Sequence, residues 1–298
     1  MTDKDKLFML NKMLQERRIV ATTKIGEGLE SIVYEGFDHV TNEQVAIKQT
    51  REAHINNGND LIHESREILA QEYALLKHLQ QNGFAHSPKR LTLIETSREP
   101  LLVMDRLYPA KPLSNKEVAN VLASVHAMPL PTFLLRGMED YNDVNEVIVA
   151  RLSRRLTVIE NFVSLPFSLD QVRPYLVPGQ EHEQYCLLHM DVRPQNFLES
   201  QDGNRLFLLD WSNALIGPPL LEFCRMMEYG DFDLALPFEK AAFKTVRALL
   251  YRLDTAVMLA IVFYSEQRNE QQFEQQVKRI HNIVGALQEE VGKATVRK

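Results

Sequence analysis

The sequence predicts an α+β protein with two lobes, a small mixed lobe followed by a larger, mainly helical one. Its 298 residues are 45% apolar, enough for an ample core in two domains or in one two-lobed domain. Short β-type stretches broken by turns occupy residues 19–50, whereas helical periodicities dominate from Ser114 onward, and Pro109 and Pro112 flank the change. We therefore expect an N-terminal lobe at 1–104, a linker at 105–113 and a C-terminal lobe at 114–298.

Composition and charge narrow the class of protein. There are 40 Asp plus Glu against 34 Lys plus Arg, giving a formal charge of −6, which argues against a nucleic-acid partner. Two cysteines in separate contexts exclude a disulfide framework and fit a reducing compartment. The longest apolar run, residues 256–264, is far shorter than the ~20 residues that span a bilayer, and the N-terminus lacks a signal-peptide core. We expect a cytoplasmic protein that does not bind membranes.

The first chemically suggestive segment is a glycine loop. Gly26 and Gly28 lie between two predicted strands, the second running from Ser31 to Phe37 through Val33. A Gly-x-Gly loop lets the backbone approach an anion, because each glycine accepts a positive φ and has no side chain. An ordinary hairpin turn gives the same pattern. The loop does not open a helix, which disfavours a Rossmann site, and no Gly-Lys-Ser/Thr is present for a Walker loop.

The next predicted strand carries a lysine. Strand alternation in residues 45–48 places Ala46 and Lys48 on one face, with Val45 and Ile47 on the other. A flat base lying over Ala46 with phosphates reaching Lys48 would suit that face. A solvent-exposed lysine is the alternative interpretation.

A helix predicted over residues 60–81 offers Lys48 a partner. Its apolar stripe includes Ile68 and Leu76, and Glu72 lies one turn from each of them. A carboxylate on an apolar face needs a partner because desolvating an unpaired charge is costly. We expect Glu72 to pair with Lys48; Glu64 and Glu67 are rival candidates nearer the polar face.

The C-terminal lobe begins with a recognisable helix start. Ser114 and Glu117 have the spacing of a capping box, and apolar residues follow at helical intervals. Further helical patterns cover residues 143–163, 237–265 and 269–291.

The strongest segment combines His189, Asp191, Asn196 and Asp210. A hairpin centred near Gly203 would place Asn196 opposite Asp210, with side chains about 5 Å apart. An amide and a carboxylate oxygen are suitable Mg²⁺ ligands, and Asp191 on the preceding loop could reach a substrate hydroxyl. Taken singly, each residue has a structural alternative. His189 could be a core histidine that holds the loop, Asp210 could cap a turn, and Asn196 could be a loop residue that bonds to its own backbone.

Taken together, these residues resemble the protein-kinase-like superfamily, which has a glycine loop, a strand lysine, a helix glutamate, a catalytic loop and a metal-binding aspartate in this order. Met190 replaces the usual arginine, Ser31 the third glycine, and Asp210-Trp211-Ser212 the Asp-Phe-Gly motif, while no Ala-Pro-Glu follows. Residues 122–129 and 210–222 look like the aminoglycoside phosphotransferase and choline kinase family. The likeness covers about residues 20–225.

This resemblance implies a bilobal protein-kinase-like fold, with one helix and an antiparallel sheet in the small lobe, and the use of ATP and Mg²⁺. Asp191 would orient the acceptor hydroxyl and take its proton, while Asn196 and Asp210 would hold Mg²⁺ and complete the catalytic set. The nucleotide would be bound by residues of the N-terminal lobe, namely Gly26, Gly28, Val33, Ala46, Lys48, Glu72, Met104, Asp105 and Leu107. The backbone of 104–107 would meet the adenine edge.

The implied reaction moves the γ-phosphate of ATP to a hydroxyl of a small molecule. Five acidic residues follow the predicted catalytic segments: Glu222, Glu228, Asp231, Asp233 and Glu239. They would suit a cationic acceptor such as an aminoglycoside, an aminosugar or a choline-like compound. A solvated acidic loop is the plainer interpretation. His126 and Trp211 are assigned to packing, and Arg193 to the transferred phosphoryl group. An atypical Ser/Thr protein kinase and a non-catalytic kinase-like binding module remain as alternatives.

Overall fold

The computed structural model describes residues 2–28, 30–51, 65–97, 99–141, 143–165, 167–172, 184–232 and 240–296. Backbone contacts divide them into two compact units. Unit 1 contains the described residues before Ser114 together with 194–213, and unit 2 contains those of 114–193 and 214–296. The grouping of 194–213 with the N-terminal part was not expected from the sequence, and the lobe boundaries predicted above stay predictions.

Unit 1 is built on an antiparallel sheet whose five strands run in the order β1-β2-β3-β5-β4. The bounds are β1 Ile19–Glu27, β2 Ser31–Asp38, β3 Glu43–Thr50, β4 Leu91–Ile94 and β5 Leu101–Asp105. A second sheet joins β6 Tyr108–Pro109, β8 Phe197–Glu199 and β9 Leu206–Leu208. The linker expected at 105–113 therefore contains a short strand that pairs with the hairpin.

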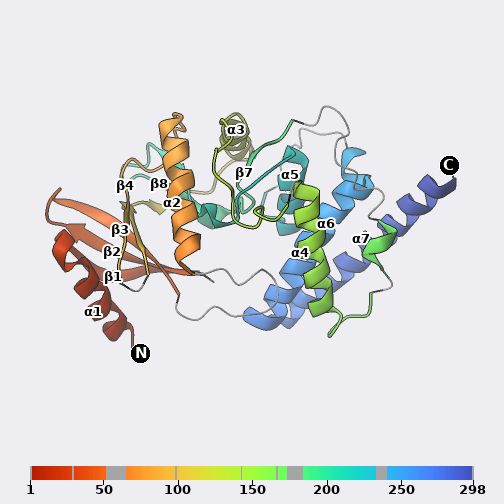
Figure 1. Ribbon diagram of the computed structural model, residues 1–298, viewed down its shortest axis with the longest axis horizontal. Helices are drawn as coiled ribbons and strands as arrows, with labels where there is room; N and C mark the ends of the chain where they lie inside the picture. The colour runs from red at the N-terminus through yellow and green to blue at the C-terminus, as the bar shows by residue number, and fades with distance from the viewer. Residues whose placement is uncertain are drawn as a thin grey trace. The chain divides into compact units, whose positions relative to one another are not determined.

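Two helices pack on the main sheet, α1 Asp3–Leu14 and α2 Ser65–Gln81 (Figure 1). Leu10 and Leu14 of α1 share a buried cluster with Val45 and Ile47 of β3. Lys48 of β3 instead bonds to α2. The alternation of the two faces of β3 is confirmed. The single helix expected with this sheet was wrong, because α1 covers the face that carries Val45 and Ile47. Residues 60–64 of the expected helix lie outside the described residues.

Unit 2 consists mainly of helices, with one short strand pair, β7 Cys186–Leu188 and β10 Leu215–Gly217. Its α-helices are α3 Asn115–His126, α4 Val144–Ile159, α5 Pro219–Tyr229, α6 Val246–Ile261 and α7 Glu270–Val296. The capping box at Ser114 is confirmed: its hydroxyl accepts from the Glu117 amide at 3.3 Å and its amide donates to the Glu117 carboxylate at 2.8 Å.

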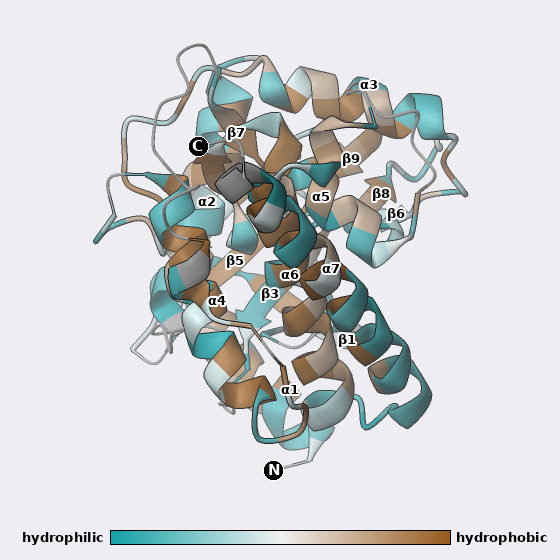
Figure 2. Ribbon diagram, turned by 90° about the vertical axis from the view of Figure 1, so that its right-hand side faces the viewer, coloured by the Kyte–Doolittle hydropathy of each residue, from teal (hydrophilic) through white to brown (hydrophobic). Residues whose placement is uncertain are grey.

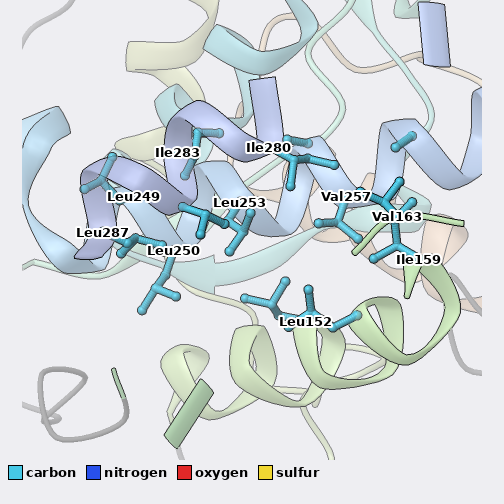
Figure 3. Close-up of a cluster of buried hydrophobic side chains, with 14 of the residues drawn as sticks. Leu152, Ile159, Val163, Leu249, Leu250, Leu253, Val257, Ile280, Ile283 and Leu287 are labelled. Carbon is cyan, nitrogen blue, oxygen red and sulfur yellow. The ribbon is translucent and has the colours of Figure 1, made fainter. Parts of the chain in front are cut away.

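The core of unit 2 lies among α4, α6 and α7. Leucine, isoleucine and valine side chains from the three helices interdigitate, among them Leu152, Leu253 and Ile283 (Figure 3). Figure 2 shows the corresponding amphipathic pattern of α7, apolar on one side and hydrophilic on the other. Among the helices of the described residues, none combines the length and apolarity needed to cross a bilayer.

The predicted start of the helix at residue 237 was wrong. Residues 242–244 form a 3₁₀ turn, and α6 begins only at Val246, where the Thr245 hydroxyl accepts from the Ala248 amide at 3.3 Å. In the sequence, apolar residues before Val246 continue the helical spacing. The helix nevertheless begins only after its N-cap residue, which does not have helical backbone angles. Residues 233–239 lie outside the described part of the chain.

Candidate active site

The centre of unit 1 is Lys48, held between two carboxylates. Its Nζ donates to Glu72 Oε2 at 2.7 Å and to Asp210 Oδ1 at 2.9 Å. Lys48 and Glu72 are 7% and 1% exposed, while the Asp210 side chain is 38% exposed. The ion pair with Glu72 is confirmed. The bond to Asp210 was not predicted; it joins the strand lysine to a residue 162 positions away.

The charge of Lys48 is stabilised by these partners. Burial disfavours an ammonium, but the negative charges of Asp210 and Glu72 raise the pKa of Lys48 well above its ordinary value. Glu72 is bound through Oε2; its buried Oε1 has no hydrogen-bond partner among the described residues. Lys48 is thus a fixed positive charge at neutral pH, suited to phosphate oxygens.

Asp210 is placed by an unusual backbone conformation. Its φ of 68° lies in the left-handed region, which costs a non-glycine residue about 1 kcal/mol or more. Oδ1 also accepts from the Ser212 hydroxyl at 3.3 Å, and the Ser212 carbonyl accepts from Gln71 of α2 at 3.2 Å. Trp211 is fully buried, with its Nε1 donating to the Leu208 carbonyl at 3.0 Å, which confirms its packing role.

The hairpin that leads to Asp210 is present, but its predicted register was wrong by one residue. Phe197 pairs with Leu208, and the Leu209 amide donates to the Asn196 carbonyl at 3.0 Å, so Leu209 rather than Asp210 is opposite Asn196. The Ser200 amide donates to the Arg205 carbonyl at 2.9 Å and closes a loop of even length. A loop centred on Gly203 would have odd length, which is the source of the error.

Oxygen donors suited to Mg²⁺ are available in unit 1. Asn196 is 8% exposed, and Asp210 offers its carboxylate. No three His, Cys, Asp or Glu side chains of the described residues gather into a metal-binding group. An amide and a carboxylate nevertheless fit Mg²⁺, which is typically held by one or two carboxylates, water and substrate phosphates.

The glycine loop connects β1 and β2 as predicted. The Gly28 amide donates to the Ser31 carbonyl at 2.8 Å, and Gly26 lies opposite Val33 in the sheet. Neither glycine has a positive φ, and β1 has a register irregularity between Lys24 and Gly26. A methyl group would also fit at either position.

Arg51 was missed by the sequence reasoning. Its side chain donates to the Gly28 carbonyl at 3.0 Å and lies 3.4 Å from Glu27, and its amide donates to the Glu30 carbonyl at 2.9 Å. It therefore fastens both sides of the glycine loop to the end of β3. Only its position just after the strand carrying Lys48 could have indicated this.

The segment predicted to meet an adenine edge lies at the end of β5. Met104 pairs with Ala46 of β3 and Leu91 of β4, whereas Leu107 follows the end of the strand. The Asp105 carboxylate accepts from the amides of Lys89 and Arg90 at 2.6 and 3.1 Å. Asp105 therefore fixes a neighbouring loop, and the Leu107 carbonyl accepts from the Arg106 guanidinium. The contact with an adenine edge stays a prediction.

Asp191 belongs to unit 2, where backbone and side-chain bonds shape its loop. The Asp191 amide donates to His189 Nδ1 at 3.1 Å, which confirms that His189 holds the loop. Met190 has a φ of 65°, and its amide donates to Glu222 Oε1 at 2.8 Å. His126 donates from Nε2 to Glu222 Oε2 at 2.7 Å, because a carboxylate only accepts. His126 thus does more than pack, as it supports the carboxylate beneath the loop.

A family model described as the phosphotransferase enzyme family (APH) matches residues 60–249. The chain belongs to this family. The match covers Glu72, Asp191, Asn196 and Asp210, and membership of the protein-kinase-like superfamily is confirmed. This protein is a phosphotransferase with an antiparallel sheet in one part and a mainly helical second part, as expected.

Several solved structures share the fold of this chain. Macrolide 2′-phosphotransferase type I matches with a TM-score of 0.57 at 13% identity, over 94% of this chain and 98% of that chain. Choline kinase LicA from Streptococcus pneumoniae matches with a TM-score of 0.56 at 14% identity, over 95% and 99%. The streptomycin-ATP-APH(2″)-IIa ternary complex matches with 0.56 at 13% identity, over 95% and 99%. No curated protein matches in sequence.

The predicted acidic cluster of this phosphotransferase does not form an exposed acidic surface among its described members. Glu222 is buried beneath the Asp191 loop, and buried Glu228 accepts from Arg252 at 2.7 Å. Asp231 accepts from Arg193 at 2.9 Å. Asp233 and Glu239 lie outside the described residues. The sequence showed the acids but not the cations, which come from distant parts of the chain.

Two further residues of the phosphotransferase were missed, Arg225 and the hydroxyl of Tyr229. Tyr229 Oη donates to Asp191 Oδ1 at 2.9 Å and accepts from Arg225 Nε at 3.0 Å. The spacing of four residues between Arg225 and Tyr229 shows that they share a helix face. Nothing in the sequence indicates which loop that face meets.

Proposed function

We propose that this phosphotransferase moves the γ-phosphate of Mg·ATP to a hydroxyl group of a small molecule. The observation that carries the proposal is Lys48 fixed between Glu72 and Asp210 at 2.7 and 2.9 Å, in a chain whose family transfers phosphoryl groups. A buried, ionised lysine beside a partly exposed aspartate supplies a positive charge for phosphate and an oxygen ligand for its metal ion.

In this proposal the small-molecule acceptor hydroxyl is oriented by Asp191, which takes its proton as the phosphoryl group transfers. Asn196 and Asp210 would hold Mg²⁺, which neutralises charge on the phosphates. Lys48 binds the α- and β-phosphates, and the loop at Gly26 and Gly28 covers the triphosphate. Phosphoryl transfer depends mainly on positioning and charge neutralisation, so this set of residues is sufficient.

The length of the connecting chain limits the distance between the proposed base, Asp191, and the proposed metal ligand Asn196. Asp191 and Asn196 are five residues apart, which a fully extended chain spans in at most about 18 Å. We therefore propose that residues 1–104 bind the nucleotide, 105–113 act as the hinge, and 114–298 bind the acceptor. In this arrangement the segment 189–196 links the base to the metal ligands.

The similar structures, and not the acidic stretch, support the proposed acceptor class. Those structures are named for streptomycin, a macrolide and choline, all of which carry hydroxyl groups. The described acids after Glu222 are paired, so they give no reason to restrict the acceptor to cations. We propose a hydroxylated metabolite or natural product, with aminoglycosides, macrolides, aminosugars and amino alcohols as the first candidates.

A screen of ADP release tests the proposal. The protein is incubated with Mg·ATP and a panel of aminoglycosides, macrolides, amino alcohols, sugars and nucleosides, with Asp191→Asn as the matched blank. We expect acceptor-dependent ADP release by the unaltered protein alone. Transfer of radiolabel to protein substrates instead of to any panel member would favour a protein kinase. Absence of Mg·ATP binding by calorimetry would favour a binding module.

A further inference from the structure

The candidate base is contacted by a side chain from a different element, Tyr229 at the end of α5. Tyr229 Oη lies 2.9 Å from Asp191 Oδ1 and 3.0 Å from Arg225 Nε. Arg225 lies one helical turn before Tyr229 and is only 4% exposed. Helix geometry places the two side chains on one face, so α5 presents them to the loop as a unit.

The chemistry of the three groups fixes the direction of each hydrogen bond. A guanidinium has donors only, so Arg225 must donate to the Tyr229 oxygen. The single hydroxyl proton of Tyr229 is then donated to Asp191 Oδ1. Burial raises the pKa of Tyr229 well above its usual value, so the hydroxyl keeps its proton at neutral pH.

The ring of Tyr229 makes a second contact with the same loop. The guanidinium of Arg193 lies over the ring at 4.8 Å from its centroid, and that of Arg225 lies at 5.5 Å. Arg193 is held by Asp231, whose carboxylate accepts from its Nε at 2.9 Å. Arg193 is two residues after Asp191, so Tyr229 fixes the loop at the carboxylate and again just beyond it.

We propose that Tyr229 is a positioning residue for Asp191, oriented by Arg225, and that it sets the direction in which Asp191 meets the acceptor hydroxyl. This inference rests on the proposed function, because it assigns a role to the base of that reaction. A hydrogen bond to one carboxylate oxygen restricts rotation about the terminal side-chain bond, which is otherwise soft. The carboxylate then keeps one orientation, and small misplacements of a reacting group are known to cost large factors in rate.

A crystallographic comparison tests the positioning directly. Tyr229→Phe removes only the hydroxyl, and we expect the Asp191 carboxylate to rotate or to occupy more than one orientation. Tyr251→Phe is the matched control, because Tyr251 is buried in the same unit and its hydroxyl donates to Asn145 Oδ1 at 2.6 Å. Asp191 should keep a single orientation in that variant. An unchanged Asp191 in Tyr229→Phe would overturn the proposal.

Kinetics supply the second test, with the acceptor found in the screen. We expect Tyr229→Phe to lower kcat by roughly ten-fold or more with the KM for ATP unchanged, because the lost bond is to a charged group. Tyr251→Phe should keep kcat. In an Asp191→Asn background, Tyr229→Phe should cause no further loss, since the hydroxyl acts through Asp191. An equal loss in both backgrounds, or an unchanged kcat in Tyr229→Phe, would contradict the role.

The two proposals fail in different ways. If the unaltered protein phosphorylates no panel member and binds no Mg·ATP, the proposed function is wrong. The crystallographic comparison still decides whether Tyr229 holds Asp191, because it requires no turnover.

Discussion

At the scale of single residues, the site depends on how buried and half-buried charges are neutralised. Lys48 is bonded to both Glu72 and Asp210, so one cation joins a strand, a helix and the end of a hairpin. Removing one partner from a buried pair leaves an uncompensated charge, which is more costly than the net value of the pair. The acids of α5 follow the same rule, since Glu222 and Glu228 are buried with hydrogen-bonded partners.

Asp191→Asn should separate chemistry from nucleotide binding. The amide keeps the shape of the side chain but cannot take a proton. We expect kcat to fall by ~10²-fold or more, with nucleotide affinity unchanged. Steady-state kinetics and calorimetry with ATP measure the two effects. Turnover at the unaltered rate would remove Asp191 from the role of base.

Asp210→Ala should abolish Mg²⁺-dependent nucleotide binding, because it removes the carboxylate ligand and one partner of Lys48. Calorimetric titration of ATP with and without Mg²⁺ measures this. Asp202→Ala is the control, since Asp202 is an exposed carboxylate at the turn of the same hairpin. Retained Mg²⁺ dependence in Asp210→Ala, or its loss in Asp202→Ala, would contradict the assignment.

At the scale of elements, the hairpin from Phe197 to Leu208 places Asp210 beside Lys48. Its turn contains Gly203 with a φ of 69°, and the neighbouring bond from the Ser200 amide to the Arg205 carbonyl sets the register. The register determines which residue follows the last paired position. Asp210 has a left-handed backbone conformation, and its side chain accepts a hydrogen bond from Lys48.

Two glycine-to-alanine substitutions should change stability in opposite directions. Gly203→Ala places a side chain at positive φ and should lower the free energy of unfolding by about 1–2 kcal/mol. Gly285→Ala is the matched comparison, because it lies inside α7 with open space around the added methyl group. It should raise the free energy of unfolding by about 0.5–1 kcal/mol. Urea denaturation measures both; equal effects would disprove the backbone argument.

At the scale of the whole molecule, each unit contains a buried carboxylate whose charge is favoured. Burial alone would raise the pKa of Asp38 and of Glu222. Hydrogen bonds from Arg90 to Asp38, and from His126 and the Met190 amide to Glu222, lower both pKa values instead. These carboxylates therefore stabilise the two units only while they are ionised.

The free energy of unfolding should decrease in acid. A lowered folded-state pKa contributes stability that is complete above the ordinary values, 3.8 for Asp38 and 4.5 for Glu222. That contribution is lost as pH falls through the lowered values. Urea denaturation from neutral pH to about pH 3 measures the loss. Glu222→Gln should show a smaller acid-induced loss than the unaltered protein, and an identical loss would contradict the role of Glu222.

Local features and the family could be predicted from the residue pattern. The capping box at Ser114, the two faces of β3 and the pairing of Glu72 with Lys48 follow from periodicity and from the cost of burying a lone charge. The order of these motifs was enough to indicate a phosphotransferase of the protein-kinase-like superfamily. Such features depend on neighbours within one element, or on a single long-range partner.

The remaining features depend on how the chain folds in three dimensions. Lys48 bonds to a second carboxylate, and the hairpin register differs by one residue from the predicted one. The acids of α5 are paired, and Tyr229 bonds to Asp191. Each depends on a loop closure or on a partner far away in the sequence, which no helical or strand repeat specifies. Buried polar groups must find hydrogen bonds, but which group supplies them is settled by how the elements pack.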